Sequence, residues 1–177
     1  TSANETEWAS IVTTAGCADA YIERHERYDT ERVIDFLLRD RENPSSVMSV
    51  VDAARNNARM VRTALTREVW EAMNGAWLVL KQVLAKPVAA AELPNVLASI
   101  RQQGALVRAA LHGTMLRNDI FRFARLGSFV ERADNMARIL DVKYYVLLPS
   151  TAYVGSSLDN VQWETILRSA SAERAFN

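Results

Sequence analysis

Apolar residues recur every three to four positions along almost the whole chain, and nowhere do apolar and polar residues alternate for long. The first pattern is typical of amphipathic helices and the second of strands. The chain is therefore predicted to be all-α, a multi-helix antiparallel bundle, because helices joined by short loops pack side by side. The predicted helices cover about 5–27, 30–38, 44–65, 67–85, 95–111, 118–148 and a last segment from 160, after a Ser/Gly/Asp-rich loop at 150–159.

Polar residues at the start of three of these helices are predicted N-caps, because their side chains can accept hydrogen bonds from the first free N–H groups. They are Asp29 next to Thr30, then Asn43 with Pro44 in the first turn, and Thr66. Proline suits the first helical turn, where its missing N–H costs nothing.

One twelve-residue segment occurs twice, as VVDAARNNARMV at 50–61 and as FVERADNMARIL at 129–140. At an offset of 79 residues, two positions reverse their charge: Arg55 corresponds to Asp134, and Arg62 to Asp141. We interpret the two copies as related helices, with a charged flank that is net basic in the first and net acidic in the second. The identical pairs are Val51 and Val130, Ala54 and Ala133, Asn56 and Asn135, Ala58 and Ala137, Arg59 and Arg138.

Each copy has an apolar stripe and a charged flank about 120° away on a helical wheel. The stripes, expected to face the core, are Val47, Val51, Ala54, Ala58, Val61 and Leu65, and Leu126, Val130, Ala133, Ala137, Leu140 and Tyr144. The flanks are Asp52, Arg55, Arg59 and Arg62 in the first copy, and Glu131, Asp134, Arg138 and Asp141 in the second. Small alanines let helix axes approach closely. We expect a pseudo-twofold arrangement in which the two flanks meet in an ion-pair network.

Pairs at helical neighbour spacing are also expected within each copy. Asp52 can reach Asn56 or Arg55, and Asp134 can reach Arg138. The network as a whole has two interpretations. It can fix the register of the bundle, since buried ion pairs contribute more to specificity than to stability. Alternatively, the same charged residues line a pocket for a charged ligand.

Composition narrows the possible functions. The formal net charge of zero lacks the basic excess of a nucleic-acid binder, and no apolar run is long enough for a membrane span. The single Cys17 cannot form an internal disulfide, which favours the cytoplasm. His25 and His112 lack the Glu-x-x-His spacing of a metal-binding bundle, and no phosphate loop or dinucleotide fingerprint occurs. We expect no metal and no cofactor, and the four tryptophans to lie in the core.

Two long segments carry a family resemblance, ENPSSVMSVVDAARNNARMVRTALTREVWEAMN at 42–74 and GTMLRNDIFRFARLGSFVERADNMARILDVKYYVLLPS at 113–150. They resemble the bacterial alpha-E family, all-helical proteins named for a Glu-Arg motif. That motif corresponds to Glu131 and Arg132, so Arg132 joins the candidate binding residues. The first copy has Ala53 at the arginine position, which makes an identical role for both copies unexpected.

The resemblance implies a domain organisation and a partner. Members are longer, and this chain starts without methionine and stops just after a helical pattern, so residues 1–177 are expected to be one helical domain from a longer protein. Members are encoded beside, or fused to, ATP-grasp and transglutaminase-like proteins, which implies a peptide- or amide-bond-forming system.

We therefore expect an accessory or partner-binding helical domain, with no nucleic acid and no membrane as partner. The chain has no recognisable nucleophile, metal cluster or nucleotide loop. Two alternatives remain open. An enzyme would use Glu131 or Asp134 as general acid or base, with a pKa shifted by burial. A ligand sensor would use the arginines without turnover.

Overall fold

The computed structural model describes residues 3–142 and 154–169, and in these residues every regular element is a helix. The predicted all-α bundle is confirmed. The elements are α1 (Ala3–Thr14), α2 (Ala18–Ile22), α3 (Thr30–Leu38), α4 (Val47–Met60), the 3₁₀ turn η1 (Arg62–Ala64), α5 (Arg67–Val83), α6 (Leu93–Thr114), α7 (Asp119–Val142) and α8 (Ser157–Ser169).

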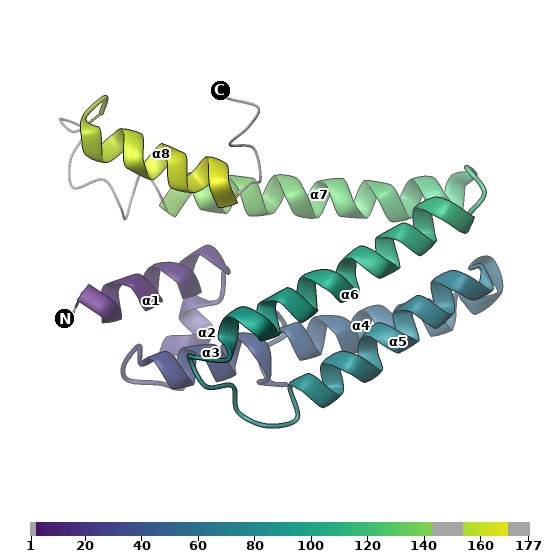
Figure 1. Ribbon diagram of the computed structural model, residues 1–177, viewed down its shortest axis with the longest axis horizontal. Coiled ribbons are helices and arrows are strands. Elements are labelled where there is room, and N and C mark those ends of the chain that lie inside the picture. The colour runs from purple at the N-terminus through teal and green to yellow at the C-terminus, as the bar shows by residue number, and fades with distance from the viewer. Residues whose placement is uncertain (1–2, 143–153, 170–177) are drawn as a thin grey trace.

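Helices α4 to α7 follow one another in alternating directions (Figure 1). α5 packs against both α4 and α6, and these three helices form the main layer of the fold. A short turn joins α6 to α7. α7 then runs back on the side of α6 away from α4 and α5, and it contacts α1. Short connections between sequential helices make such antiparallel neighbours the expected arrangement.

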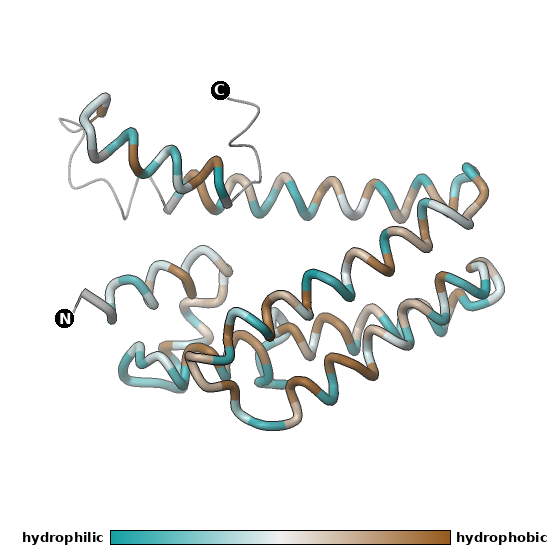
Figure 2. The backbone as a smooth tube through the Cα atoms, viewed as in Figure 1, coloured by the Kyte–Doolittle hydropathy of each residue, from teal (hydrophilic) through white to brown (hydrophobic). Residues whose placement is uncertain are grey.

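The apolar side chains are buried in three clusters. The largest lies inside the α3–α6 region and contains Ile34, Leu38, Met48, Leu80, Leu84, Val88 and Val96. A second cluster joins α1, α2 and α3 through Val12, Cys17, Tyr21, Val33 and Phe36. The third closes the α6–α7 end with Val69, Met115 and Phe121. Figure 2 shows hydrophobic positions recurring between hydrophilic ones along α4, α5 and α6.

Local capping chemistry fixes two of the predicted helix starts. The side chain of Asp29 accepts a hydrogen bond from the Arg32 N–H, and Thr66 accepts one from the Val69 N–H. The prediction for α4 was wrong: Ser46, not Asn43, is its N-cap and accepts from the Ser49 N–H. Asn43 lies three residues before this N-cap and is fully buried. Its side-chain amide donates to the Phe36 carbonyl and so stabilises the end of α3.

The predicted helix at 5–27 is two helices. Gly16 breaks it with a φ of +70°, in the left-handed region that glycine adopts at helix C-termini. Further along, α4 ends at Met60 and a 3₁₀ turn covers part of the predicted continuation to Leu65. α8 begins at Ser157, three residues before the predicted start. The predicted end of the long helix near Leu148, the stripe residue Tyr144 and the loop positions 150–153 lie outside the described residues. None of the described helices is both long and apolar enough to cross a bilayer.

Candidate functional site

The predicted charged residues do not form one network. α4 and α7 are not among the helix pairs in extensive contact, and over the described residues no ion pair joins them. The prediction of two facing, interlocked flanks is therefore wrong. The physical reason is that α4 packs against α5, its neighbour along the chain, while α7 is held at its two ends by other elements. The charged residues occupy two separate places, one on α4 and α5 and one on α7.

On α4 and α5, basic side chains alternate with indole rings. We call this set the arginine–tryptophan strip, and it consists of Arg55, Arg62, Trp70, Trp77 and Lys81. Arg55 Cζ lies 4.3 Å from the centre of the Trp77 ring and 5.9 Å from that of Trp70. Arg62 Cζ lies 5.6 Å from the Trp70 ring, and Lys81 Nζ lies 4.8 Å from the Trp77 ring. These distances fall within the range of cation–π attraction.

Hydrogen bonds hold the strip in place. Arg55 Nε donates to Asn74 Oδ1 at 2.8 Å, which fixes the guanidinium between the two helices. Trp77 Nε1 donates to Asp52 Oδ1, and the second oxygen of the same carboxylate pairs with Arg41. Asp52 was expected to reach Asn56 or Arg55. It instead orients the Trp77 ring, so its role in the strip is structural.

The strip carries positive charge that no carboxylate neutralises. Asp52 is paired with Arg41. Within the described part of the chain, no ion pair involves Arg55, Arg62 or Lys81, and the same holds for the exposed Arg59 beside them. A guanidinium that rests one face on an indole keeps its N–H edge available for carboxylates or phosphates. The geometry is suited to binding an anion.

The tryptophans of the strip were expected to lie in the core, and they are instead half-buried beside arginines. The missed signal was spacing. Arg55 on α4 and Arg62 in η1 are seven residues apart, and Trp70 and Trp77 are seven apart on α5. Residues seven apart lie on the same face of a helix, so two antiparallel helices with such pairs can bring all four side chains together.

On α7 the charged residues of the motif region are exposed, except Arg138, which is half-buried. Arg138 Nε donates to Asp134 Oδ2 at 2.8 Å, as the spacing predicted. This hydrogen bond and the carboxylate's charge raise the pKa of Arg138. Glu131 accepts a 3.5 Å hydrogen bond from Asn135. Arg132 and Asp141 are exposed, and no ion pair among the described residues involves either of them. The predicted apolar stripe of α7 is also exposed, and this expectation is corrected as well: Leu126 is 55% and Val130 61% accessible.

Arg138 also makes the contact between α7 and the α1–α2 turn. Its guanidinium lies directly over Gly16, where an added Cβ would stand only 2.7 Å from Arg138 Cζ. Beneath this turn lies Cys17, whose pKa is raised by burial, with Asn43 and the Arg138 charge acting in the opposite direction. A glycine is needed here for its φ, and the Arg138 guanidinium would have to shift to admit a Cβ.

The fold and the positions of the motif residues can now be compared with known families. The whole chain, residues 1–177, matches the model of a family described as a predicted alpha-helical domain with a conserved ER motif. The chain belongs to the Alpha-E family. It matches no curated protein and no solved structure. The Glu131–Arg132 pair, which we take as the ER motif of this Alpha-E chain, lies on the exposed middle of α7.

Proposed function

We propose that this Alpha-E chain is a partner-binding accessory domain, and that the arginine–tryptophan strip binds an acidic segment of a protein partner. One observation carries the proposal: Arg55 and Arg62 stack on two indole rings, while no carboxylate within the described residues pairs with them.

The spacing of the basic residues favours a peptide ligand. Arg55 and Arg59 occupy positions i and i+4 of α4, so they lie on the same face of that helix, and Arg62 follows in the 3₁₀ turn η1 just after the helix ends. Residues three or four apart are about 5–6 Å apart between Cβ atoms. An acidic helix has carboxylates at the same spacing, and each can pair bidentately with a guanidinium. The strip therefore matches an acidic amphipathic helix better than a single small anion.

For the partner, we propose an ATP-grasp or transglutaminase-like protein of a peptide- or amide-bond-forming system. This part rests on the resemblance to alpha-E proteins encoded beside such enzymes. The helical domain would position its partner through the strip, and the bond-forming chemistry would belong to the partner.

The enzyme alternative gains no support from the geometry. It requires a carboxylate buried enough to act as general acid or base. Glu131 and Asp134 are both exposed, and the Asp134 side chain is 51% accessible. The sensor alternative uses the same arginines as the proposal, and the experiment below separates the two.

The test measures binding of this chain to the neighbouring ATP-grasp or transglutaminase-like protein by isothermal titration calorimetry at two salt concentrations. The Arg59→Glu/Arg62→Glu variant removes the outward charge of the strip and leaves the Arg55 contacts in place. The matched control is Arg101→Glu/Arg108→Glu, which makes the same charge change at exposed positions of α6.

We expect the strip variant to weaken binding at least tenfold, the control to stay within about threefold of the unmodified chain, and added salt to weaken binding because surface charges are screened. Equal losses in both variants, or no association with either protein, would overturn the proposal. Binding of free glutamate as tightly as of the protein would identify a small-molecule sensor instead.

A further inference from the structure

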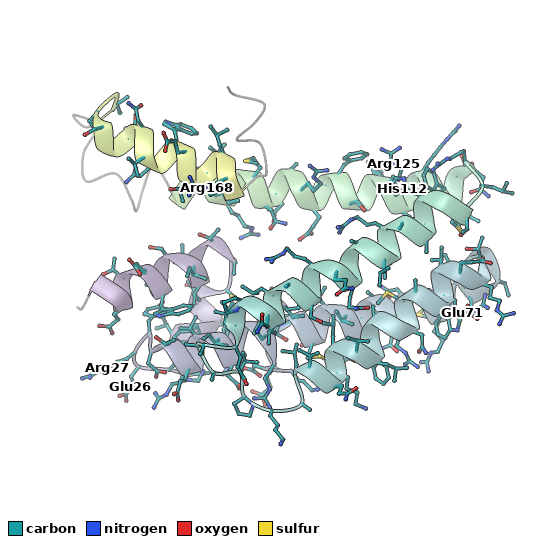
Figure 3. All side chains as sticks on the ribbon, in the orientation of Figure 1. Glu26, Arg27, Glu71, His112, Arg125 and Arg168 are labelled. Carbon is teal, nitrogen blue, oxygen red and sulfur yellow. The ribbon has the colours of Figure 1, made fainter. Side chains whose placement is uncertain are left out.

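The middle of α7 is open to solvent on every side. From Arg122 to Ala137 each residue is exposed, including Phe123 at 72% accessibility. Among the described residues, its main contacts lie near its ends, through Phe121 in the cluster with Val69 and through the contact with α1. Figure 1 shows α7 running along the edge of the molecule, and Figure 3 places Arg125 on it near His112 of α6. An exposed helix rich in large apolar residues is typical of an interaction surface.

The exposed apolar residues follow a heptad pattern. The α7 seam, as we call it, occupies alternating steps of three and four residues, the a and d positions of a coiled coil. Its members are Phe123, Leu126, Val130, Ala133, Ala137 and Leu140. From Leu126 onward these are the residues that the sequence pattern placed on a core-facing stripe. In the structure no other helix covers the first five of them. The seam thus has the pattern of a helix that pairs with another helix.

The sizes of the side chains along the α7 seam indicate that its partner is a second, antiparallel copy of α7. The first half carries large side chains, Phe123, Leu126 and Val130, and the second half carries Ala133 and Ala137. A parallel pair of α7 helices would place alanine opposite alanine and leave gaps. An antiparallel pair centred between residues 131 and 132 places Leu126 and Val130 opposite alanines, and a positions opposite d positions. The opposing pairs are Leu126 with Ala137, Val130 with Ala133, and Phe123 with Leu140 of the second copy.

The distribution of charge along α7 also favours an antiparallel pair. The segment 117–125 contains three arginines and one aspartate, a net charge of +2. The segment 131–141 contains three carboxylates and two arginines, a net charge of −1. Antiparallel pairing brings the basic segment of one copy beside the acidic segment of the other. It also sets the two helix dipoles in opposite directions.

We infer that two copies of this chain associate through the α7 seams as an antiparallel, twofold-symmetric pair. Such an interface is self-complementary, as a twofold contact between identical chains requires. It lies apart from the arginine–tryptophan strip on α4 and α5, so it can be tested independently of the proposed partner binding.

Sedimentation equilibrium over a wide range of protein concentrations tests the association. We expect a monomer–dimer equilibrium that Leu126→Asp shifts to monomer by at least tenfold in the dissociation constant. Leu106→Asp is the matched control, since Leu106 is a similarly exposed leucine (51%) on α6. Circular dichroism verifies that both variants keep their helices. A chain that stays monomeric at the highest concentration, or a dimer equally sensitive to both variants, overturns the inference.

Disulfide trapping tests the direction of the helices. In a Cys17→Ser background, Leu126→Cys/Ala137→Cys should form a covalent dimer under mild oxidation, because the two introduced thiols oppose each other across the pair. Each single variant should form no covalent dimer, since identical residues then stand about 16 Å apart along the axis, beyond disulfide reach. Crosslinking by the Leu126→Cys variant alone would show a parallel pair and contradict the inference.

Discussion

Among the basic residues of the arginine–tryptophan strip, Arg55 should be the one whose replacement by alanine destabilises the protein most. The side chain makes a close cation–π contact with Trp77 at 4.3 Å and a weaker one with Trp70 at 5.9 Å. Such contacts contribute about 0.5–1 kcal/mol each at partly exposed sites. Its 2.8 Å hydrogen bond to Asn74 adds about 1 kcal/mol. The expected loss in the free energy of unfolding is therefore about 2 kcal/mol.

Urea denaturation followed by circular dichroism measures this loss. In a domain of this size about 1 kcal/mol lowers the melting temperature by 2–4 °C, so Arg55→Ala should melt about 4–8 °C lower. Arg55→Lys keeps a cation near Trp77 but loses the planar fork and the bond to Asn74, and should lie in between. Arg59→Ala, at an exposed position with no such contacts, should stay within about 0.5 kcal/mol of the unmodified chain.

A double-mutant cycle isolates the cation–π term. Arg55→Ala and Trp77→Leu, alone and together, should show a coupling free energy of about 0.5–1 kcal/mol, because each change removes the same contact. Additive effects, or equal stability of the Arg55→Ala and Arg59→Ala variants, would refute the idea that the strip joins α4 to α5. The expected difference between Arg55→Ala and Arg59→Ala follows from their different roles. Arg55 joins α4 to α5, whereas Arg59 and Arg62 face the proposed ligand.

Three other positions lead to measurable predictions. Gly16→Ala places a side chain at a positive φ and against Arg138, and should lower the free energy of unfolding by about 1–3 kcal/mol in thermal or urea unfolding. The loss should be smaller in an Arg138→Ala background, where only the backbone strain remains. Asn43→Ala should cost about 1–3 kcal/mol, because it leaves the buried Phe36 carbonyl without its donor. Burial raises the pKa of the Cys17 thiol, so its contribution to stability is complete below the thiol's unfolded pKa of about 8.5 and is lost as pH rises through the higher folded value. The Cys17→Ala variant should therefore lose less stability in alkaline urea titrations than the unmodified chain, and equal losses would contradict a buried, neutral thiol.

The sequence was sufficient wherever the determinant of structure is local. The starts of α3 and α5 follow from Asp29 and Thr66, because a capping side chain acts on N–H groups only a few residues away. The break at Gly16 was missed because a glycine inside a helical pattern is usually tolerated. What ends the helix here is the positive φ of Gly16, and the Arg138 guanidinium that lies over this turn comes from more than a hundred residues further along the chain.

The same distinction explains the error at the charged flanks. A helical stripe shows that one face of a helix is suited to burial, but it does not specify the helix that covers it. α4 packs against α5, to which a short connection joins it. Arg55 therefore contacts Trp77 and not the acidic residues of α7. The pair Asp134 and Arg138 was predicted correctly because both residues belong to the same helix turn.

The two sides of α7 can serve different contacts. With Ile120 as the angular reference, the α7 seam centres about 110° to one side, whereas Glu131 and Arg132 lie about 20° and 120° to the other. The motif pair thus points away from the seam by more than 100°, at the midpoint of the helix. In the inferred pair of chains the twofold axis passes between residues 131 and 132, so the motif pairs of the two copies come near this axis on outward surfaces. Pairing through the seam would therefore leave both Glu131–Arg132 pairs accessible to other ligands. Neither Glu131 nor Arg132 need contribute to the association of the two chains.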